Sequence, residues 1–192
     1  ASFAERAKQG PIRTIVASAD ADMGRKRVAA TQLIAAYRNI GSHWADLDPL
    51  KRQERPPLPD LDPAFYGFSE ADLDIVFNAS NTYFGKESMS LRELLQNLRE
   101  TYCSSIGAEF MYISDQAQKR WWQERLESTR ARPVFTAEKK KHILERLTAA
   151  EGLERFLHTK YVGQKRFSLE GGESFIAAID ELIQHAGERG IQ

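Results

Sequence analysis

The chain has 192 residues, with 27 basic and 27 acidic side chains, so its formal net charge is zero at pH 7. This balance argues against nucleic-acid binding and against electrostatic attachment to a membrane, because both normally require a basic excess. The apolar share of 42% and the charged share of 28% are ordinary for a globular domain. The single cysteine, Cys103, cannot form an internal disulfide, which fits a reducing compartment, and we expect it to lie buried on a helix.

The first nineteen residues have neither a hydrophobic period nor the apolar core of a secretory signal, and the chain has no initiator methionine. We expect residues 1–19 to form a flexible lead-in and the whole chain to be a piece cut from a longer polypeptide. No apolar run approaches the roughly 20 residues that a membrane-spanning helix needs.

The pattern becomes helical at Asp20. Apolar residues then recur along one face of a helix that ends at Gly41. Residues 42–68 contain five prolines and cannot be helical throughout. Eight apolar side chains predict that this segment is anchored to the protein surface; they are Trp44, Leu47, Leu50, Leu58, Leu61, Phe65, Tyr66 and Phe68. The alternative is that residues 55–59, RPPLP, form a proline-rich docking peptide in the polyproline II conformation.

The middle of the chain alternates helical patterns with turn residues. We expect a short helix over 69–77 and a turn or short hairpin over 80–89. A longer helix then begins at the capping box of Ser90 and Glu93. A further helix begins at Asp115 and carries Trp121 and Trp122 about 100° apart, so that one faces the core and the other the rim of the core.

Three more helices are expected in the last third. Thr136 caps the first, Thr148 with Glu151 forms a capping box for the second, and the third runs from Phe175 to Ala186. The fold class is therefore mainly α, with six or seven amphipathic helices, a long proline-rich irregular segment and little or no sheet. We expect a single helical domain over residues 20–187 and a truncated connection over 188–192.

Chemical motifs are scarce in this sequence. It contains no P-loop, no GxGxxG, no GxSxG and no HExxH motif, and its four histidines are scattered. The exception is KYVGQKRFSLEGGESF at residues 160–175, which combines several cations with a double glycine. Two interpretations remain open: Arg166 pairs with Glu170 to brace the loop before the last helix, or the stretch faces an anionic ligand.

Several longer stretches carry a family resemblance. They are DLDPL (46–50), LDPAFYGFSEADLD (61–74), LRELLQNLRETYCSSIGAEFMYISD (91–115), WWQERLE (121–127) and residues 144–174. In this order and at similar spacing they resemble the N-terminal part of the E1 component of the 2-oxoglutarate dehydrogenase complex. The resemblance spans roughly residues 22–187, which is nearly the whole chain.

The resemblance implies an enzyme that decarboxylates 2-oxoglutarate on thiamine diphosphate with Mg²⁺ and passes the succinyl group to the lipoyl arm of the E2 component. A related substrate, 2-oxoadipate, is the alternative, and a stand-alone helical interaction module that binds through the proline-rich segment is another. The family enzyme is a homodimer whose α/β domains bind the cofactor. Its location is the bacterial cytoplasm, or the mitochondrial matrix in a eukaryote.

The same resemblance places the cofactor-binding segments and a His-Arg-Gly-Arg motif beyond the end of this chain, and the peptide that docks on E2 before Ala1. We therefore expect this chain by itself to be inactive and to bind neither thiamine diphosphate nor a metal. The resemblance implies that Phe167 lies near the substrate. Arg166 and Glu170 belong to the same motif, with a role that bracing of the loop would also explain.

Overall fold

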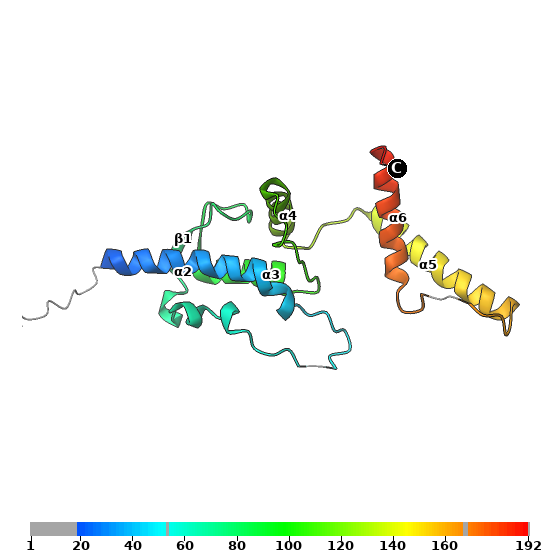
Figure 1. The fold of residues 1–192 in the computed structure, drawn as a ribbon, viewed down its shortest axis with the longest axis horizontal. Coiled ribbons are helices and arrows are strands. Elements are labelled where there is room, and N and C mark those ends of the chain that lie inside the picture. The colour runs from blue at the N-terminus through cyan, green and yellow to red at the C-terminus, as the bar shows by residue number, and fades with distance from the viewer. Residues whose placement is uncertain (1–18, 53, 167–168, 192) are drawn as a thin grey trace, which may run out of the picture. The chain divides into compact units, whose positions relative to one another are not determined.

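The computed structural model describes residues 19–52, 54–166 and 169–191 (Figure 1). Within these ranges the regular structure consists of five α-helices and one small antiparallel sheet. The helices are α2 (Ala19–Ile40), α3 (Leu91–Tyr102), α4 (Gln116–Thr129), α5 (Ala137–Lys160) and α6 (Glu173–Glu188), and the strands are β1 (Val76–Asn78) and β2 (Ser88–Ser90). The prediction of a mainly helical fold with little sheet is confirmed.

The described residues form two compact units that divide after Pro133. The first unit contains α2, α3, α4 and the sheet, and the second contains α5 and α6. The single helical domain expected over residues 20–187 stays a prediction. Of the expected lead-in over 1–19, only Ala19 lies within the described residues, where it begins α2.

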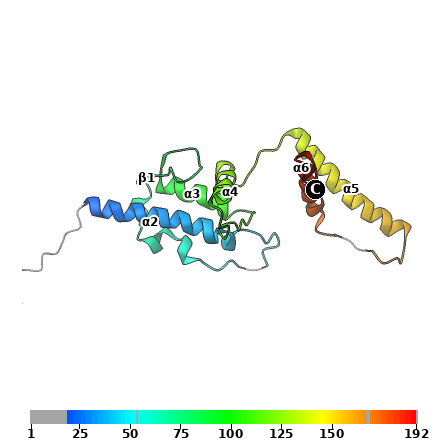
Figure 2. The ribbon, with the colours of Figure 1, turned by 45° about the horizontal axis from the view of Figure 1, so that its top comes forward.

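The core of the first unit lies between α2 and α3, which are side by side in two views (Figures 1 and 2). Leu33 on α2 and Leu98 on α3 are fully buried, because apolar residues recur on one face of each helix. The Ser90 side chain accepts a hydrogen bond from the backbone N–H of Glu93 and so caps α3, as predicted. Cys103 lies buried at the C-terminal end of this helix, also as predicted.

The proline-rich segment is anchored at some of the expected side chains. It forms the short 3₁₀ turns Pro59–Leu61 and Pro63–Tyr66, and Leu61 and Phe68 are buried. The Tyr37 hydroxyl donates a hydrogen bond of 3.0 Å to the carbonyl oxygen of Leu61, which fixes the segment to α2. The prediction was wrong for three anchors, since the side chains of Leu47, Leu50 and Phe65 are exposed.

The helix predicted over 69–77 does not form. Instead, Ser69 and Asp72 complete a capping box around the single 3₁₀ turn Glu70–Asp72. The chain then extends into β1, which pairs with β2 in the register Phe77 with Met89. Residues 80–89, where a turn or short hairpin was expected, form the connection and the start of β2, and the first strand of the hairpin lies earlier than expected. The physical reason is that Ile75, Val76 and Phe77 are β-branched or aromatic, and these residues favour a half-buried strand.

Two further predictions about helices were wrong. The two helices expected from Thr136 and Thr148 are one continuous helix, α5, because no glycine or proline separates them and Leu147, Ala149 and Ala150 are strong helix formers. Thr136 does cap α5, by accepting from the Lys139 N–H. On α4, the predicted division of the two tryptophans fails: Trp121 is 48% exposed and Trp122 41%, so neither faces the core.

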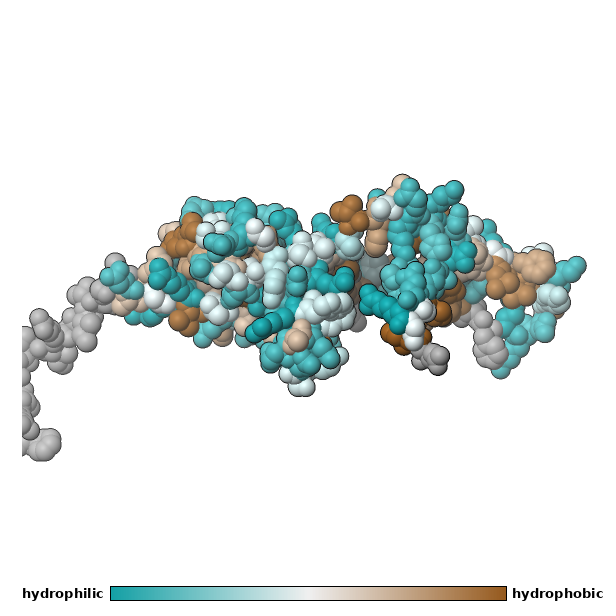
Figure 3. Space-filling view, turned by 90° about the horizontal axis from the view of Figure 1, so that it is seen from above, coloured by the Kyte–Doolittle hydropathy of each residue, from teal (hydrophilic) through white to brown (hydrophobic). Residues whose placement is uncertain are grey.

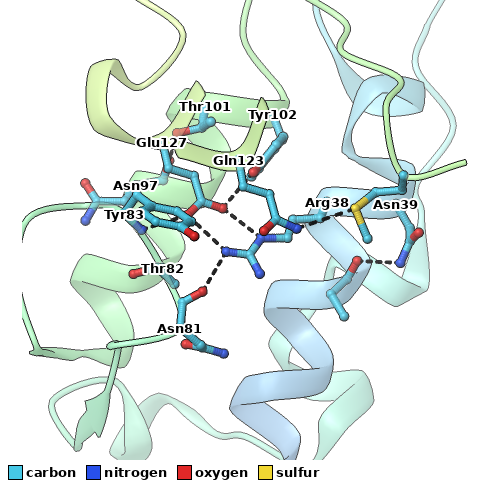
Figure 4. A network of polar contacts seen from close by, with 12 residues as sticks. Arg38, Asn39, Asn81, Thr82, Tyr83, Asn97, Thr101, Tyr102, Gln123 and Glu127 are labelled. Carbon is cyan, nitrogen blue, oxygen red and sulfur yellow. Dashed lines mark hydrogen bonds and ion pairs between the residues drawn. The ribbon is translucent and has the colours of Figure 1, made fainter. Parts of the chain in front are cut away.

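The helix α4 is instead held by a buried carboxylate (Figure 4). Glu127 accepts a bidentate ion pair from Arg38 on α2, with distances of 2.7 Å from Nε and 3.0 Å from Nη2. It also accepts from the Tyr102 hydroxyl at 2.7 Å and from the Tyr83 backbone N–H at 2.9 Å. Burial, followed by the negative charge of Glu127, raises the pKa of Tyr102 well above its usual value. The network therefore joins α2, α3, α4 and the loop after β1.

Candidate functional site

The second unit is a helical hairpin whose two helices are joined by the stretch that the sequence singled out. The Lys139 ammonium group pairs with the Glu181 carboxylate, and His142 Nε2 lies 3.0 Å from Asp180 Oδ2. The hydrogen bond from His142 lowers the pKa of Asp180, and the hydrogen bond from Lys139 lowers the pKa of Glu181. These polar contacts align α5 with α6, so the connecting loop begins and ends at fixed points.

Arg166 fastens this loop to α5. Its Nη2 lies 2.6 Å from Nδ1 of His158, and its Nη1 donates a hydrogen bond of 3.3 Å to the carbonyl oxygen of Glu154. Because a guanidinium group only donates, the His158 Nδ1 must act as the acceptor and carry no proton. Arg166 is therefore attached to α5, and the two open interpretations, bracing through Glu170 and facing an anionic ligand, both stay predictions.

A second attachment lies at Leu169, directly after residues 167 and 168, which the structure does not describe. The backbone N–H of Leu169 donates to Glu154 Oε1 at 2.9 Å, so this one glutamate holds the loop through both its carbonyl and its carboxylate. The turn into α6 then requires Gly171, whose φ of +87° is strained for residues with a side chain. The neighbouring Gly172 lets its own backbone approach the Leu169 carbonyl closely.

A hollow of about 680 Å³ lies between α5, this loop and the start of α6. Its acidic lining consists of Glu151, Glu154, Glu170 and Glu173. Its basic and imidazole lining consists of Arg155, His158 and Arg166. The predicted residues Arg166 and Glu170 thus line the same hollow, while Phe167, the third of them, lies outside the described residues. A predicted Arg166–Glu170 pair stays a prediction.

Sequence reasoning missed His158 and Glu154 as partners of the loop. The two residues are four apart on α5, so their side chains lie on one face of the helix, one turn from each other. That spacing was visible in the sequence. Nothing in the sequence indicated, however, that this face would meet Arg166 and Leu169.

The described residues include no group of three or more His, Cys, Asp and Glu side chains that could hold a metal ion. Within the same residues, no helix is long and apolar enough to cross a membrane.

Comparison with known proteins gives one consistent result. The chain is 92% identical over all 192 residues to the 2-oxoglutarate dehydrogenase E1 component of Cupriavidus necator, of which it covers 20%. It is 49% identical over 180 residues to the protein of that name from Azotobacter vinelandii and 44% identical over 174 residues to the one from Haemophilus influenzae. These alignments cover 94% and 90% of this chain and 19% of each relative. No family model matches the chain.

The relatives carry a single name and match nearly the whole of this chain, which places the chain among the 2-oxo acid dehydrogenase components. Within that class, the chain belongs to the 2-oxoglutarate dehydrogenase E1 family. It spans about a fifth of the length of the curated relatives that it matches.

Proposed function

We propose that this chain is the N-terminal helical segment of an E1 enzyme that decarboxylates 2-oxoglutarate on thiamine diphosphate and Mg²⁺ and transfers the succinyl group to the lipoyl arm of E2. The observation that carries the proposal is the identity of 92% over the whole chain to an E1 component. The catalytic and cofactor-binding residues lie elsewhere in the parent protein, which acts as a homodimer in the cytoplasm of a bacterium.

Within that enzyme, the loop after α5 forms one edge of the substrate site, with Phe167 near the substrate. The structural support is indirect but specific. Arg166 is fixed to His158 and Glu154 on one side of Phe167, and Leu169 is fixed to Glu154 on the other. Accurate placement of groups beside a substrate is a large part of catalytic rate.

The second unit also has an apolar surface that suits packing against the rest of the E1 chain. No described residue of α5 or α6 is buried. Large apolar side chains are more than half exposed on both helices, and brown patches remain visible on the surface in Figure 3. The apolar side chains that are more than half exposed include Leu144, Leu153, Phe156, Phe175, Leu182 and Ile183. Exposed patches of this kind mark interaction surfaces, and the parent has about four times as much chain to contribute as is present here, by the length of its relatives.

The alternative is a stand-alone helical module that binds partners through residues 55–59. The structure gives this segment an intramolecular role, since Arg55 stacks on the Trp44 ring at 4.5 Å and donates to the Trp44 carbonyl. A related E1 acting on 2-oxoadipate differs only in substrate choice, and enzyme assay distinguishes it.

The direct test is to purify the full-length parent and measure 2-oxoglutarate-dependent decarboxylation with thiamine diphosphate and Mg²⁺, with 2-oxoadipate as the competing substrate. We expect 2-oxoglutarate to have the higher kcat/KM. The 192-residue chain alone should give no turnover and no binding of thiamine diphosphate in a calorimetric titration. A parent without 2-oxoglutarate activity would refute the function, and micromolar cofactor binding by the chain alone would refute the assignment of cofactor binding to the remainder.

Phe167→Ala in the full-length parent tests the placement of the loop. A residue beside the substrate should lose on the order of 100-fold in turnover when truncated, with a nearly unchanged melting temperature. A core aromatic would instead lower the stability by about 3–5 kcal/mol and leave activity per folded molecule near normal. The second pattern would remove Phe167 from the site.

A further inference from the structure

A separate hollow of about 410 Å³ in the first unit is lined by three arginines. Arg55 comes from the proline-rich segment, Arg99 from the last turn of α3, and Arg132 from the segment that follows α4. These side chains are far apart in sequence, so the fold itself brings them together. Asp46 is the one carboxylate residue in the lining.

None of these arginines forms an ion pair with another residue in the described part of the chain. Each makes one neutral hydrogen bond instead. Arg55 Nη1 donates to the Trp44 carbonyl at 2.7 Å, Arg99 Nε to the Tyr37 hydroxyl at 3.3 Å, and Arg132 Nη2 to Ser104 Oγ at 3.1 Å. A guanidinium group has five N–H donors, so most donors of each remain available to a ligand.

Two of the three arginines have further support from their surroundings. The face of the Trp44 ring supports Arg55 at 4.5 Å. The turn that precedes Arg132 has two successive residues in the left-handed region, Arg130 at φ 51° and Ala131 at φ 53°, and the buried Ala131 donates its N–H to the Leu126 carbonyl at 2.8 Å. Such a conformation is uncommon for residues other than glycine and needs support from its surroundings.

The charges of the lining leave a clear positive excess. Asp46 contributes one negative charge, and the C-terminus of α3 contributes about half a charge through its partial dipole. Neither cancels three guanidinium groups. Arginine is the residue best suited to bind carboxylate or phosphate oxygens, because its planar fork makes paired hydrogen bonds to them.

We propose that this arginine pocket binds a small anion with two or more charges, in the form of phosphate or carboxylate groups. The volume suits a compact metabolite, since small-molecule sites usually begin at about 300 Å³. The site is independent of the hollow beside Arg166, which lies in the other unit. It therefore gives this part of the protein a ligand of its own, apart from the substrate of the proposed enzyme.

The test titrates the 192-residue chain at low ionic strength with two probes, inorganic pyrophosphate and tricarballylate. Binding is followed by calorimetry and by the NMR signal of the Trp44 indole N–H, which donates to the Pro56 carbonyl beside the pocket. We expect saturable binding of at least one probe with a Kd below about 1 mM. The tighter probe identifies phosphate or carboxylate as the preferred group. Binding should weaken as salt is added, because the contacts are exposed to solvent.

Arg132→Gln is the informative variant, because within the described residues the Arg132 side chain makes a single hydrogen bond, to Ser104, and the substitution leaves the backbone bond to Thr129 in place. It should weaken binding by about tenfold. Arg120→Gln is the matched control: it removes the same charge from an exposed position on α4 outside the pocket, and it should change Kd by less than about twofold. Melting temperatures of both variants establish that they are folded.

Three results would overturn the proposal. The first is no saturable binding of either probe up to about 10 mM. The second is an equal loss of affinity in the two variants, which would show attraction to overall charge. The third is binding to the 192-residue chain that is absent from the full-length parent, which would show that an acidic side chain of the parent occupies the pocket.

Discussion

Replacing Glu127 by glutamine should destabilise the first unit strongly, although the two side chains have the same shape. The Glu127 side chain is fully buried, and four hydrogen bonds converge on its carboxylate from Arg38, Tyr102 and the Tyr83 N–H. In the variant, the amide NH₂ group replaces one carboxylate oxygen. If it replaces Oε2, it faces the donors of Arg38 and Tyr83, and donor then meets donor.

The expected magnitude follows from the burial of the pair. Removing one partner of a buried ion pair typically costs about 3–5 kcal/mol, because the other charge remains without compensation. The Arg38 side chain retains 11% exposure and keeps its hydrogen bond to the Asn81 carbonyl, so water relieves part of the penalty. We therefore expect a loss near the lower end, about 3 kcal/mol of unfolding free energy.

The assay is urea unfolding followed by tryptophan fluorescence, which reports on the first unit because Trp44, Trp121 and Trp122 all lie there. Glu124→Gln is the control, since Glu124 is exposed on the same helix and should change stability by less than about 0.5 kcal/mol. A loss below about 1 kcal/mol for Glu127→Gln would refute the reasoning, because the carboxylate would then contribute no more than an exposed one.

Three further predictions concern the first unit. Gly41→Ala should lower stability by about 1–3 kcal/mol, since its new Cβ would lie 2.6 Å from the Cβ of the buried Tyr102 on α3. Gly24→Ala, with nothing within 4 Å of its new Cβ, should raise stability by about 0.5–1 kcal/mol. Thermal unfolding of both variants tests these two values. The hydrogen bond from Lys26 lowers the pKa of Asp72 from 3.8 to about 2. The contribution of Asp72 to the free energy of unfolding is therefore complete above about pH 4 and is lost as the pH falls toward 2. Asp72→Asn should flatten the dependence of stability on pH in that window, and an unchanged dependence would contradict the prediction. Burial raises the pKa of Cys103 from 9.0 to about 11, so at pH 8 its reaction with a disulfide reagent should be about 100-fold slower than in urea-unfolded protein; equal rates would show an exposed thiolate.

Features that depend on contacts between residues close in sequence could be predicted, and features that depend on contacts between distant residues could not. Helix caps at Ser90, Asp115 and Thr136 are local hydrogen bonds between neighbouring residues, and all three form as predicted. The prediction of a helix over residues 69–77 was wrong because the helical spacing competed with strand pairing to residues 88–90. A local sequence pattern does not show such pairing. The prediction that one of the two tryptophans faces the core was wrong for a similar reason. The buried side of α4 is defined by Glu127, a charged residue that sequence patterns predict to be exposed.

The loop beside α6 was predictable in composition but not in its attachments. The basic and glycine-rich sequence indicated a functional edge, and the structure shows Arg166 in contact with His158 and with the Glu154 carbonyl. These contacts join residues 8 and 12 positions apart, and no local pattern shows them. The arginine pocket was beyond sequence reasoning altogether, because its three cations are 33 or more residues from one another along the chain and only the packing of α3 with its neighbours brings them together.

The two helices of the second unit combine weak polar pairs with exposed apolar side chains. Its cross-helix contacts include polar pairs such as Lys139 with Glu181 and His142 with Asp180, at side chains about a third exposed. Exposed pairs of this kind contribute about 0–1 kcal/mol each. Ordering a single residue costs about 1–2 kcal/mol in backbone entropy, and burial of apolar area is the main force that offsets it. Since α5 and α6 leave Phe156, Phe175 and other large apolar side chains open to solvent, burial of this face against another surface would stabilise the pair.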